Sequence, residues 1–169
     1  MIGIAKLMLF ASGLASAFSA VPAAAADTVY VIRHLQKAPG DDPPLTAEGA
    51  ANASTLANML AGMGIGAVFA TPTRRAIQTA TPLAVQLGLP VTRYDPDKVA
   101  ALIEAANAIP GNILVVGHSN TVPDLVAQFG GDRPAAMTEQ DYGVIYVVHS
   151  GTKEVRESLL PAGAGPQGD

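Results

Sequence analysis

The chain has 169 residues, with 10 Lys or Arg, 14 Asp or Glu, three His and no Cys. A net charge of −4 argues against a general nucleic-acid or anionic-membrane surface, so an anion would have to bind at a local basic site. Without Cys, disulfides, thiol catalysis and Cys-based zinc sites are excluded.

Residues 1–26 have the pattern of a secretory signal. A single Lys6 precedes an apolar stretch from Leu7 to Phe18, and the segment ends in a run of alanines up to Ala26. A charge, an apolar run and a small-residue end are typical of a cleavable signal. The alternative is a membrane anchor, but a span usually needs about 20 strongly apolar residues. We expect an exported protein, periplasmic or secreted, with no stable membrane insertion after cleavage.

Cleavage after Ala26 would leave nine basic and fourteen acidic residues, a charge of −5. The remaining length fits one domain, expected at 27–160. Residues 161–169 are rich in Gly, Pro and Ala, and we expect a disordered tail there.

The expected domain alternates β-branched apolar runs with segments of helical periodicity. Pro82 lies inside one of the helical patterns and can kink or divide that helix. Strands followed by helices, then a terminal hairpin, predict a three-layer α/β/α sandwich with a mainly parallel sheet and a C-terminal antiparallel hairpin. In chain order we expect strand 29–33, helix 46–62, strand 67–70, helix 73–87, strand 89–94, helix 97–108, strand 112–117, helix 122–129 and strands 143–148 and 153–158.

Basic and imidazole side chains follow three of these strands. Arg33-His34 ends the first strand, Arg74-Arg75 follows the second and His118 follows the fourth. Because parallel strands share one carboxyl edge, two imidazoles and guanidinium groups are expected to meet there.

This combination suits phosphoryl transfer. Arg forks match phosphate oxygens two at a time. An imidazole held through its other nitrogen by a backbone carbonyl can attack phosphorus and form a phosphohistidine that water later cleaves. Arginines and a protonated second histidine can then hold the phosphoryl oxygens, so neither a cofactor nor a metal is expected.

Each residue also has a simpler interpretation. His34 and His118 can each be a loop or capping residue, and Arg74 and Arg75 can be solvated residues of a first helical turn. Adjacent helical positions face different ways, so we expect at most one of the two arginines at the centre. His149 resembles a hairpin-turn residue.

Three ordered segments resemble the motifs of one family. Arg33-His34 looks like an Arg-His-Gly signature, Ala70-Thr-Pro-Thr-Arg-Arg75-Ala-Ile-Gln-Thr-Ala80 is similar to Ser-Pro-x-x-Arg-Ala-x-Gln-Thr-Ala, and Gly117-His118-Ser119 resembles a second-histidine motif. Pro44-Leu45-Thr46-x-x-Gly49 also matches. The family is the histidine phosphatase superfamily, with the phosphoglycerate-mutase-like fold, and the likeness is strongest to its short phosphohistidine-phosphatase branch.

The resemblance implies that His34 is the phosphorylated nucleophile, that Arg33 and Arg75 bind the phosphoryl oxygens, and that His118 completes the pocket. Lys37 and Asn120 are candidate substrate contacts at the rim. Two features depart from the family pattern: Leu35-Gln36 replaces the residues that usually follow the nucleophile, commonly a small one and often an acidic one, and Ser119 replaces the Asp of the acid branch.

A general acid must protonate the leaving oxygen. In mutase-type relatives it comes from an insertion after the third strand, which is short here. Asp95 and Asp97 are the candidates in that region, and a helix N-cap is the alternative role for each.

The sequence therefore predicts a metal-independent phosphatase that hydrolyses a phosphomonoester or phosphoramidate through phospho-His34. The expected substrate is a phosphorylated small molecule, an envelope sugar by analogy, or a phosphoprotein. A mutase is less expected, because little sequence is left for a lid. The alternatives are a pseudo-phosphatase of the cell envelope that binds a phospholigand, and a metal site that joins the two histidines to Asp41, Asp42 or Asp95.

Overall fold

The computed structural model describes residues 26–150, 152 and 154–161. The expected signal segment lies outside this part of the chain except for Ala26, and the expected tail lies outside it except for Pro161. Among the described residues, no helix combines the length and the apolar character that crossing a membrane requires.

Six strands form one sheet in the order β3-β2-β4-β1-β5-β6. The first four strands pair in parallel, and β5 and β6 pair antiparallel, β5 beside β1. The strands and helices are β1 (Thr28–Arg33), α1 (Ala47–Leu60), β2 (Ile65–Ala70), α2 (Arg74–Leu87), β3 (Val91–Arg93), α3 (Val99–Asn107), β4 (Asn112–Gly117), α4 (Val122–Gln128), β5 (Val144–His149) and β6 (Val155–Leu159).

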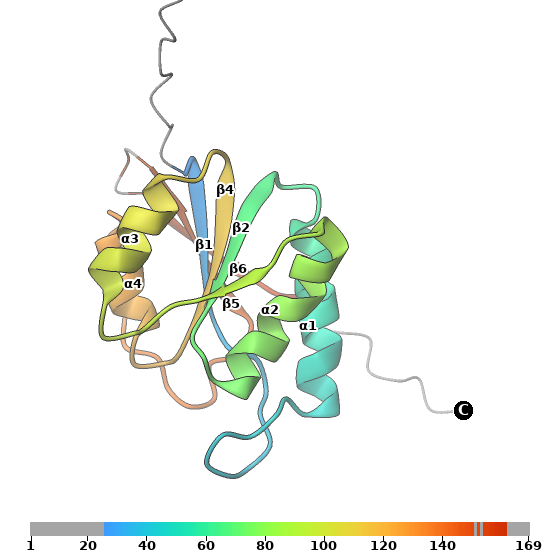
Figure 1. Ribbon diagram of the computed structural model, residues 1–169. Coiled ribbons are helices and arrows are strands. Elements are labelled where there is room, and N and C mark those ends of the chain that lie inside the picture. The colour runs from blue at the N-terminus through green and yellow to red at the C-terminus, as the bar shows by residue number, and fades with distance from the viewer. Residues whose placement is uncertain (1–25, 151, 153, 162–169) are drawn as a thin grey trace, which may run out of the picture.

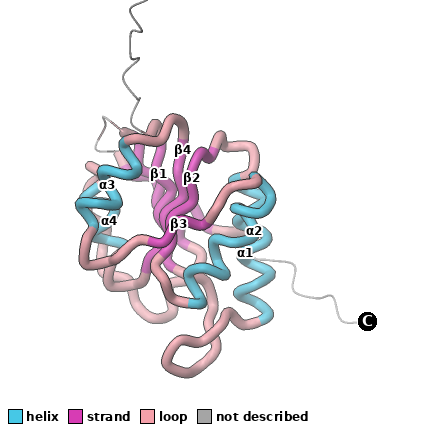
Figure 2. The backbone as a smooth tube through the Cα atoms, viewed as in Figure 1, coloured by secondary structure: helices cyan, strands magenta, loops and turns pink. Residues whose placement is uncertain are grey.

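Helices cover both faces of this sheet. Figure 1 shows α1 and α2 on one face and α3 and α4 on the other, and Figure 2 shows the strands between them. Alternate residues of a strand point to opposite faces, so β1 contributes Ile32 to the core under α1 and α2, and Val31 to the core under α3 and α4. The predicted three-layer sandwich with its terminal hairpin is confirmed.

The predicted elements occur in the predicted order, with small differences at their ends. Thr46 caps α1, since its hydroxyl accepts a hydrogen bond from the Gly49 amide. Gly88 ends α2 in the left-handed conformation. Pro82 does not divide α2, which runs unbroken from Arg74 to Leu87. The third strand has only three residues instead of the predicted 89–94.

The central strands β2, β4 and β1 bring their carboxyl ends together. Register pairs Arg33 of β1 with Gly117 of β4, and Ala70 of β2 with Val116 of β4. The segments that leave these three ends are the ones that carry the predicted site residues. The loop after β1 extends from the same edge of the sheet (Figure 1).

Candidate active site

The two predicted histidines lie side by side although 84 residues separate them in the sequence. The His34 amide donates a hydrogen bond to the Gly117 carbonyl over 2.9 Å, so the sheet pairing of β1 and β4 continues to the first histidine. The two imidazole rings then lie edge to face, with centroids 5.3 Å apart. Gly117 is needed here, because a Cβ would lie 3.0 Å from the side chains of Leu125 and Thr121.

His34 is held as a neutral imidazole with one nitrogen free. Its Nδ1 lies 2.9 Å from the Leu35 carbonyl oxygen, which can only accept, so Nδ1 carries the proton and Nε2 keeps its lone pair. Burial, with the Arg33 charge among lesser causes, lowers the pKa of His34 to about 4. The ring is therefore unprotonated at neutral pH and can attack an electrophile through Nε2.

His118 is also neutral in the free site. Its Nε2 lies 2.9 Å from Oγ1 of Thr71, and its Nδ1 lies 3.5 Å from a terminal nitrogen of Arg75. A guanidinium only donates, so Nδ1 accepts and Nε2 carries the proton. Burial, and then the charges of Arg75 and Arg33, lower the pKa of His118 to about 4. The expected protonated second histidine is therefore not found in the free site.

Arg33 and Arg75 both reach this centre. The Arg33 side chain is 2% exposed and the Arg75 side chain 18%. The Nε atom of each guanidinium is buried and has no hydrogen-bond partner among the described residues. Because buried donors are normally satisfied, two unpartnered guanidinium nitrogens beside two imidazoles indicate a site for an anion.

A loop before β5 completes the site. Arg33 donates from Nη1 to the Thr138 carbonyl over 2.8 Å and from Nη2 to the Glu139 carboxylate over 2.9 Å. The Tyr142 ring lies over the guanidinium, 4.3 Å away, and beside His34, with ring centroids 6.1 Å apart. Loop residues without a motif give no sequence signal of this kind, so Thr138, Glu139 and Tyr142 were not predicted.

Comparisons with known proteins agree with this geometry. The sequence profile of the histidine phosphatase superfamily (branch 1) matches residues 29–96. The structure is also similar to that of the protein histidine phosphatase SixA complexed with tungstate, at a TM-score of 0.57 and 26% identity over 78% of this chain and 94% of that one. Residues 29–96 thus match the histidine phosphatase superfamily, and the fold of the described chain is similar to that of a solved histidine phosphatase.

Other relatives add information on the fold and on coverage. The mycobacterial glucosyl-3-phosphoglycerate phosphatase Rv2419c shares the fold, with a TM-score of 0.59 and 13% identity over 80% of this chain and 99% of its own. The uncharacterised protein Rv0525 of Mycobacterium tuberculosis is 46% identical over 67 residues, 40% of this chain. That alignment spans 31% of the length of Rv0525.

Leu35 and Gln36, which depart from the histidine phosphatase pattern after His34, do not point into the site. The Leu35 side chain is fully buried in the core under α1 and α2, and its amide donates to the Thr79 hydroxyl over 3.0 Å. The Gln36 side chain contacts Glu48 and Asn52 of α1. Leu35 thus fixes the segment that follows His34 to the core.

The remaining predicted residues differ in their positions. Lys37 lies near the site, since its charge contributes to the lowered pKa of Glu139. Asn120 is exposed in the turn that precedes α4. The Arg74 side chain is exposed, and the Arg74 backbone amide donates a hydrogen bond to the Asp42 carboxylate. Of the two adjacent arginines, Arg75 alone therefore reaches the histidines, as helical geometry predicts.

Asp95 and Asp97 lie in a turn that their own contacts stabilise. The Asp95 carboxylate accepts a hydrogen bond from the Asp97 amide over 3.0 Å and pairs with Lys98 at 3.5 Å. The N-cap of α3 is Lys98, so neither aspartate is the predicted cap. In the described part of the chain, the Asp95 carboxylate contacts residues of its own turn, whereas the Glu139 carboxylate contacts Arg33 in the site.

The alternative of a metal site lacks a gathered ligand set. In the described part of the chain, no group of three or more His, Asp or Glu side chains is arranged to hold a metal ion. Asp42, one of the proposed ligands, instead pairs with Arg75 at 3.6 Å.

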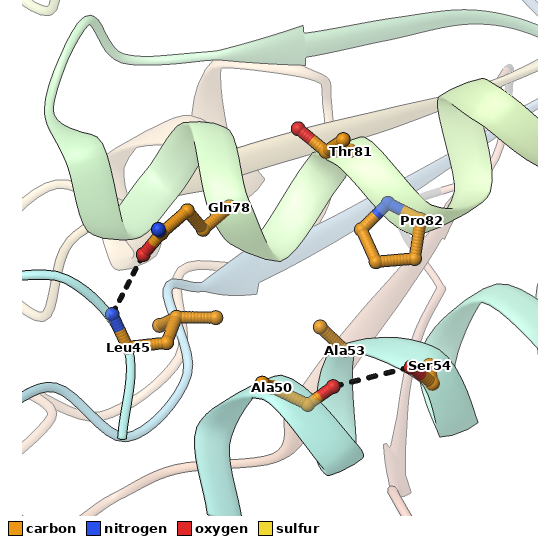
Figure 3. Close-up of a pocket in the computed structure, with 7 residues that line it drawn as sticks. All are labelled: Leu45, Ala50, Ala53, Ser54, Gln78, Thr81 and Pro82. Carbon is orange, nitrogen blue, oxygen red and sulfur yellow. Dashed lines mark hydrogen bonds between the residues drawn. The ribbon is translucent and has the colours of Figure 1, made fainter. Parts of the chain in front are cut away.

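A groove between two helices lies apart from this chemistry. It has a volume of about 320 Å³ and is lined by residues of α1 and α2 together with Leu45 (Figure 3). Gln78 accepts a hydrogen bond from the Leu45 amide at one end of the groove. None of the predicted site residues lines it, so concavity alone would point to the wrong face.

Proposed function

We propose that the protein is a metal-independent phosphatase that hydrolyses a phosphomonoester or a phosphoramidate through a phosphohistidine on His34. One observation carries this proposal: a neutral imidazole with a free Nε2 lies beside two guanidinium groups whose buried Nε atoms have no partner among the described residues. The match of residues 29–96 to the histidine phosphatase superfamily supports it. The likeness to SixA, solved with the tetrahedral oxyanion tungstate, is consistent with an oxyanion at this position.

In the first step the Nε2 lone pair attacks phosphorus, and the leaving group departs with the bonding electrons. Arg33 and Arg75 neutralise the phosphoryl oxygens, and the Leu35 carbonyl stabilises the proton on Nδ1 as the ring becomes cationic. In the second step water attacks the phosphohistidine, and the P–N bond electrons return to Nε2. The products are the free leaving group and inorganic phosphate.

The proposed substrate carries its phosphate on an accessible group, because the segment between β3 and α3 is short and provides no lid. A phosphorylated small molecule, an envelope sugar and a phosphorylated protein side chain all meet this condition, and export to the periplasm or beyond stays a prediction from residues 1–26.

Trapping the intermediate tests the proposal. The protein is incubated with 4-nitrophenyl phosphate, quenched under alkaline conditions that preserve phosphohistidine, and mapped by mass spectrometry. We expect phosphate on His34, and His34→Ala should lower turnover by at least about 10³-fold. Phosphate on another residue would overturn the mechanism. Binding of phosphate without turnover in either protein would instead identify a pseudo-phosphatase.

A further inference from the structure

We propose that Glu139, on the loop between α4 and β5, is the general acid that protonates the leaving oxygen. This inference rests on the proposed phosphatase function. Glu139 lies between the groups of the site: one carboxylate oxygen contacts Nη2 of Arg33 and the other accepts from the Ser119 hydroxyl, each over 2.9 Å. Its charge also opposes the lowering of the His118 pKa, so the carboxylate is within electrostatic range of the second imidazole.

The loop holds the carboxylate in place while leaving its side chain in contact with water. The Thr138 amide donates to the Asp141 carboxylate and the Gln140 amide to the Thr138 hydroxyl, so the turn supports itself. The Glu139 side chain is 65% exposed, whereas Arg33 is 2% exposed. Because the Glu139 carboxylate stays largely in water while Arg33 is buried, a substrate phosphate can take the place of that carboxylate at Arg33.

When a substrate phosphate takes the place of the Glu139 carboxylate at Arg33, the pKa of Glu139 changes. In the free site the Ser119 hydroxyl, and then the Arg33 charge, hold the pKa of Glu139 below its ordinary value. A phosphomonoester dianion that binds Arg33 removes this cation from the carboxylate and adds negative charge beside it. Both changes favour the protonated carboxyl. Substrate binding therefore favours protonation of Glu139.

The proton has a defined position. Ser119 keeps its hydrogen bond to Oε1, so Oε2, the oxygen that Arg33 releases, carries the proton. As the P–O bond breaks, its electron pair stays on the leaving oxygen, and that oxygen takes the Oε2 proton. The carboxylate then accepts a proton from the water that attacks phospho-His34, and the acid is restored.

A second carboxylate near the site makes different contacts. Asp42 pairs with Arg75 at 3.6 Å, but its Oδ1 also accepts from the Arg74 amide over 2.9 Å at the start of α2. It is not among the groups that shift the pKa of either histidine. Asp42 therefore serves as a matched control: it is a loop carboxylate paired with the other site arginine.

The test compares leaving groups in the full chain. For Glu139→Gln we expect kcat on a simple alkyl phosphate to fall by about 100-fold or more, and kcat on 4-nitrophenyl phosphate to fall by less than about 10-fold, since a good leaving group needs no acid. Asp42→Asn should affect both substrates equally. In the wild type, kcat on the alkyl phosphate should also fall towards high pH, and this limb should be absent from Glu139→Gln.

Three outcomes would count against the acid. An equal loss on both substrates would assign Glu139 to binding. A lower KM with unchanged kcat would make it only a competitor of phosphate for Arg33. A retained high-pH limb in Glu139→Gln would place the acid elsewhere. Circular dichroism and the melting temperature check that the variant folds, and failure of the wild type on both substrates would instead overturn the phosphatase function itself.

Discussion

The strand-end side and the loop side of the candidate site are built differently. On the strand-end side, His34 is 2% exposed, and backbone carbonyls fix the polar atoms of His34 and Arg33. On the loop side, Glu139 and Asp42 have side chains that are 65% and 50% exposed. The proposed nucleophile is therefore preorganised, whereas the acidic partners of the arginines are exposed to exchange with a phosphate.

The difference in burial between the two sides explains how one pocket can be both charged and stable. Two guanidiniums close to two imidazoles would repel protons from both rings, and the lowered pKa values of His34 and His118 reflect this together with burial. The loop carboxylates supply counter-charge without being buried, so their desolvation cost stays small. Changes on the strand-end side should thus cost both stability and activity, and changes on the loop side should cost activity alone.

Arg33→Lys should have the largest effect on the strand-end side. A lysine has no planar fork, so it cannot donate at once to the Thr138 carbonyl and to two phosphoryl oxygens. A charge-assisted hydrogen bond is worth about 1.5–3 kcal/mol, so kcat/KM on 4-nitrophenyl phosphate should fall by about 100-fold. Arg74→Lys is the control, because that neighbouring side chain is exposed. Similar activities of the two variants would contradict the assignment of Arg33.

Gly49→Ala tests the strand-end side of the site, because it should move the segment that follows His34 without removing a site residue. A Cβ on Gly49 would lie 2.2 Å from the Gln36 carbonyl oxygen, so the segment after His34 must shift. Forced repacking costs about 1–3 kcal/mol, measurable by urea unfolding, and turnover should fall as well.

Gly62→Ala is the control for this steric effect. A Cβ there has no heavy atom within 4 Å, and the residue does not have a left-handed φ. We expect unchanged turnover and stability. If Gly49→Ala behaves like Gly62→Ala, the segment that follows His34 is not held as tightly as the close approach of Gly49 to Gln36 indicates.

The last expected effect is on the pH dependence of stability. The folded protein holds His34 and His118 neutral down to about pH 4, whereas unfolded histidines bind protons below about pH 6.5. The unfolded state therefore binds more protons between these values, and the free energy of unfolding should decrease as pH falls from about 6.5 to 4. His118→Asn should make this decrease shallower. An unchanged slope would mean that His118 is charged in the folded protein.

Much of the site could be predicted because its residues follow strands. Apolar β-branched runs located β1 and β4, and the rule that parallel strands share a carboxyl edge predicted that His34 lies beside His118. Helical geometry predicted that at most one of Arg74 and Arg75 reaches the centre, and the family resemblance selected Arg75. The short β3 and the unbroken α2 around Pro82 were predicted less well, because neighbouring elements decide where a strand ends and whether a helix tolerates proline.

The loop residues could not be predicted. Glu139 is an acidic residue in an irregular segment, and nothing in its sequence neighbourhood distinguishes it from Asp95 or Asp97. Only the antiparallel pairing of β5 with β1 brings the preceding loop over Arg33. Likewise, Leu35 departed from the family pattern, and only packing showed that its side chain enters the core instead of the pocket.

The sequence by itself determined the alternation of strands and helices, and with it the set of basic and imidazole groups at one edge, because these depend on local periodicity and one topological rule. The tertiary structure decided the neutral state of both histidines, the unpartnered guanidinium nitrogens and the position of Glu139. These depend on burial and on contacts between residues such as Arg33 and Glu139, more than 100 positions apart in the chain, which local patterns do not encode.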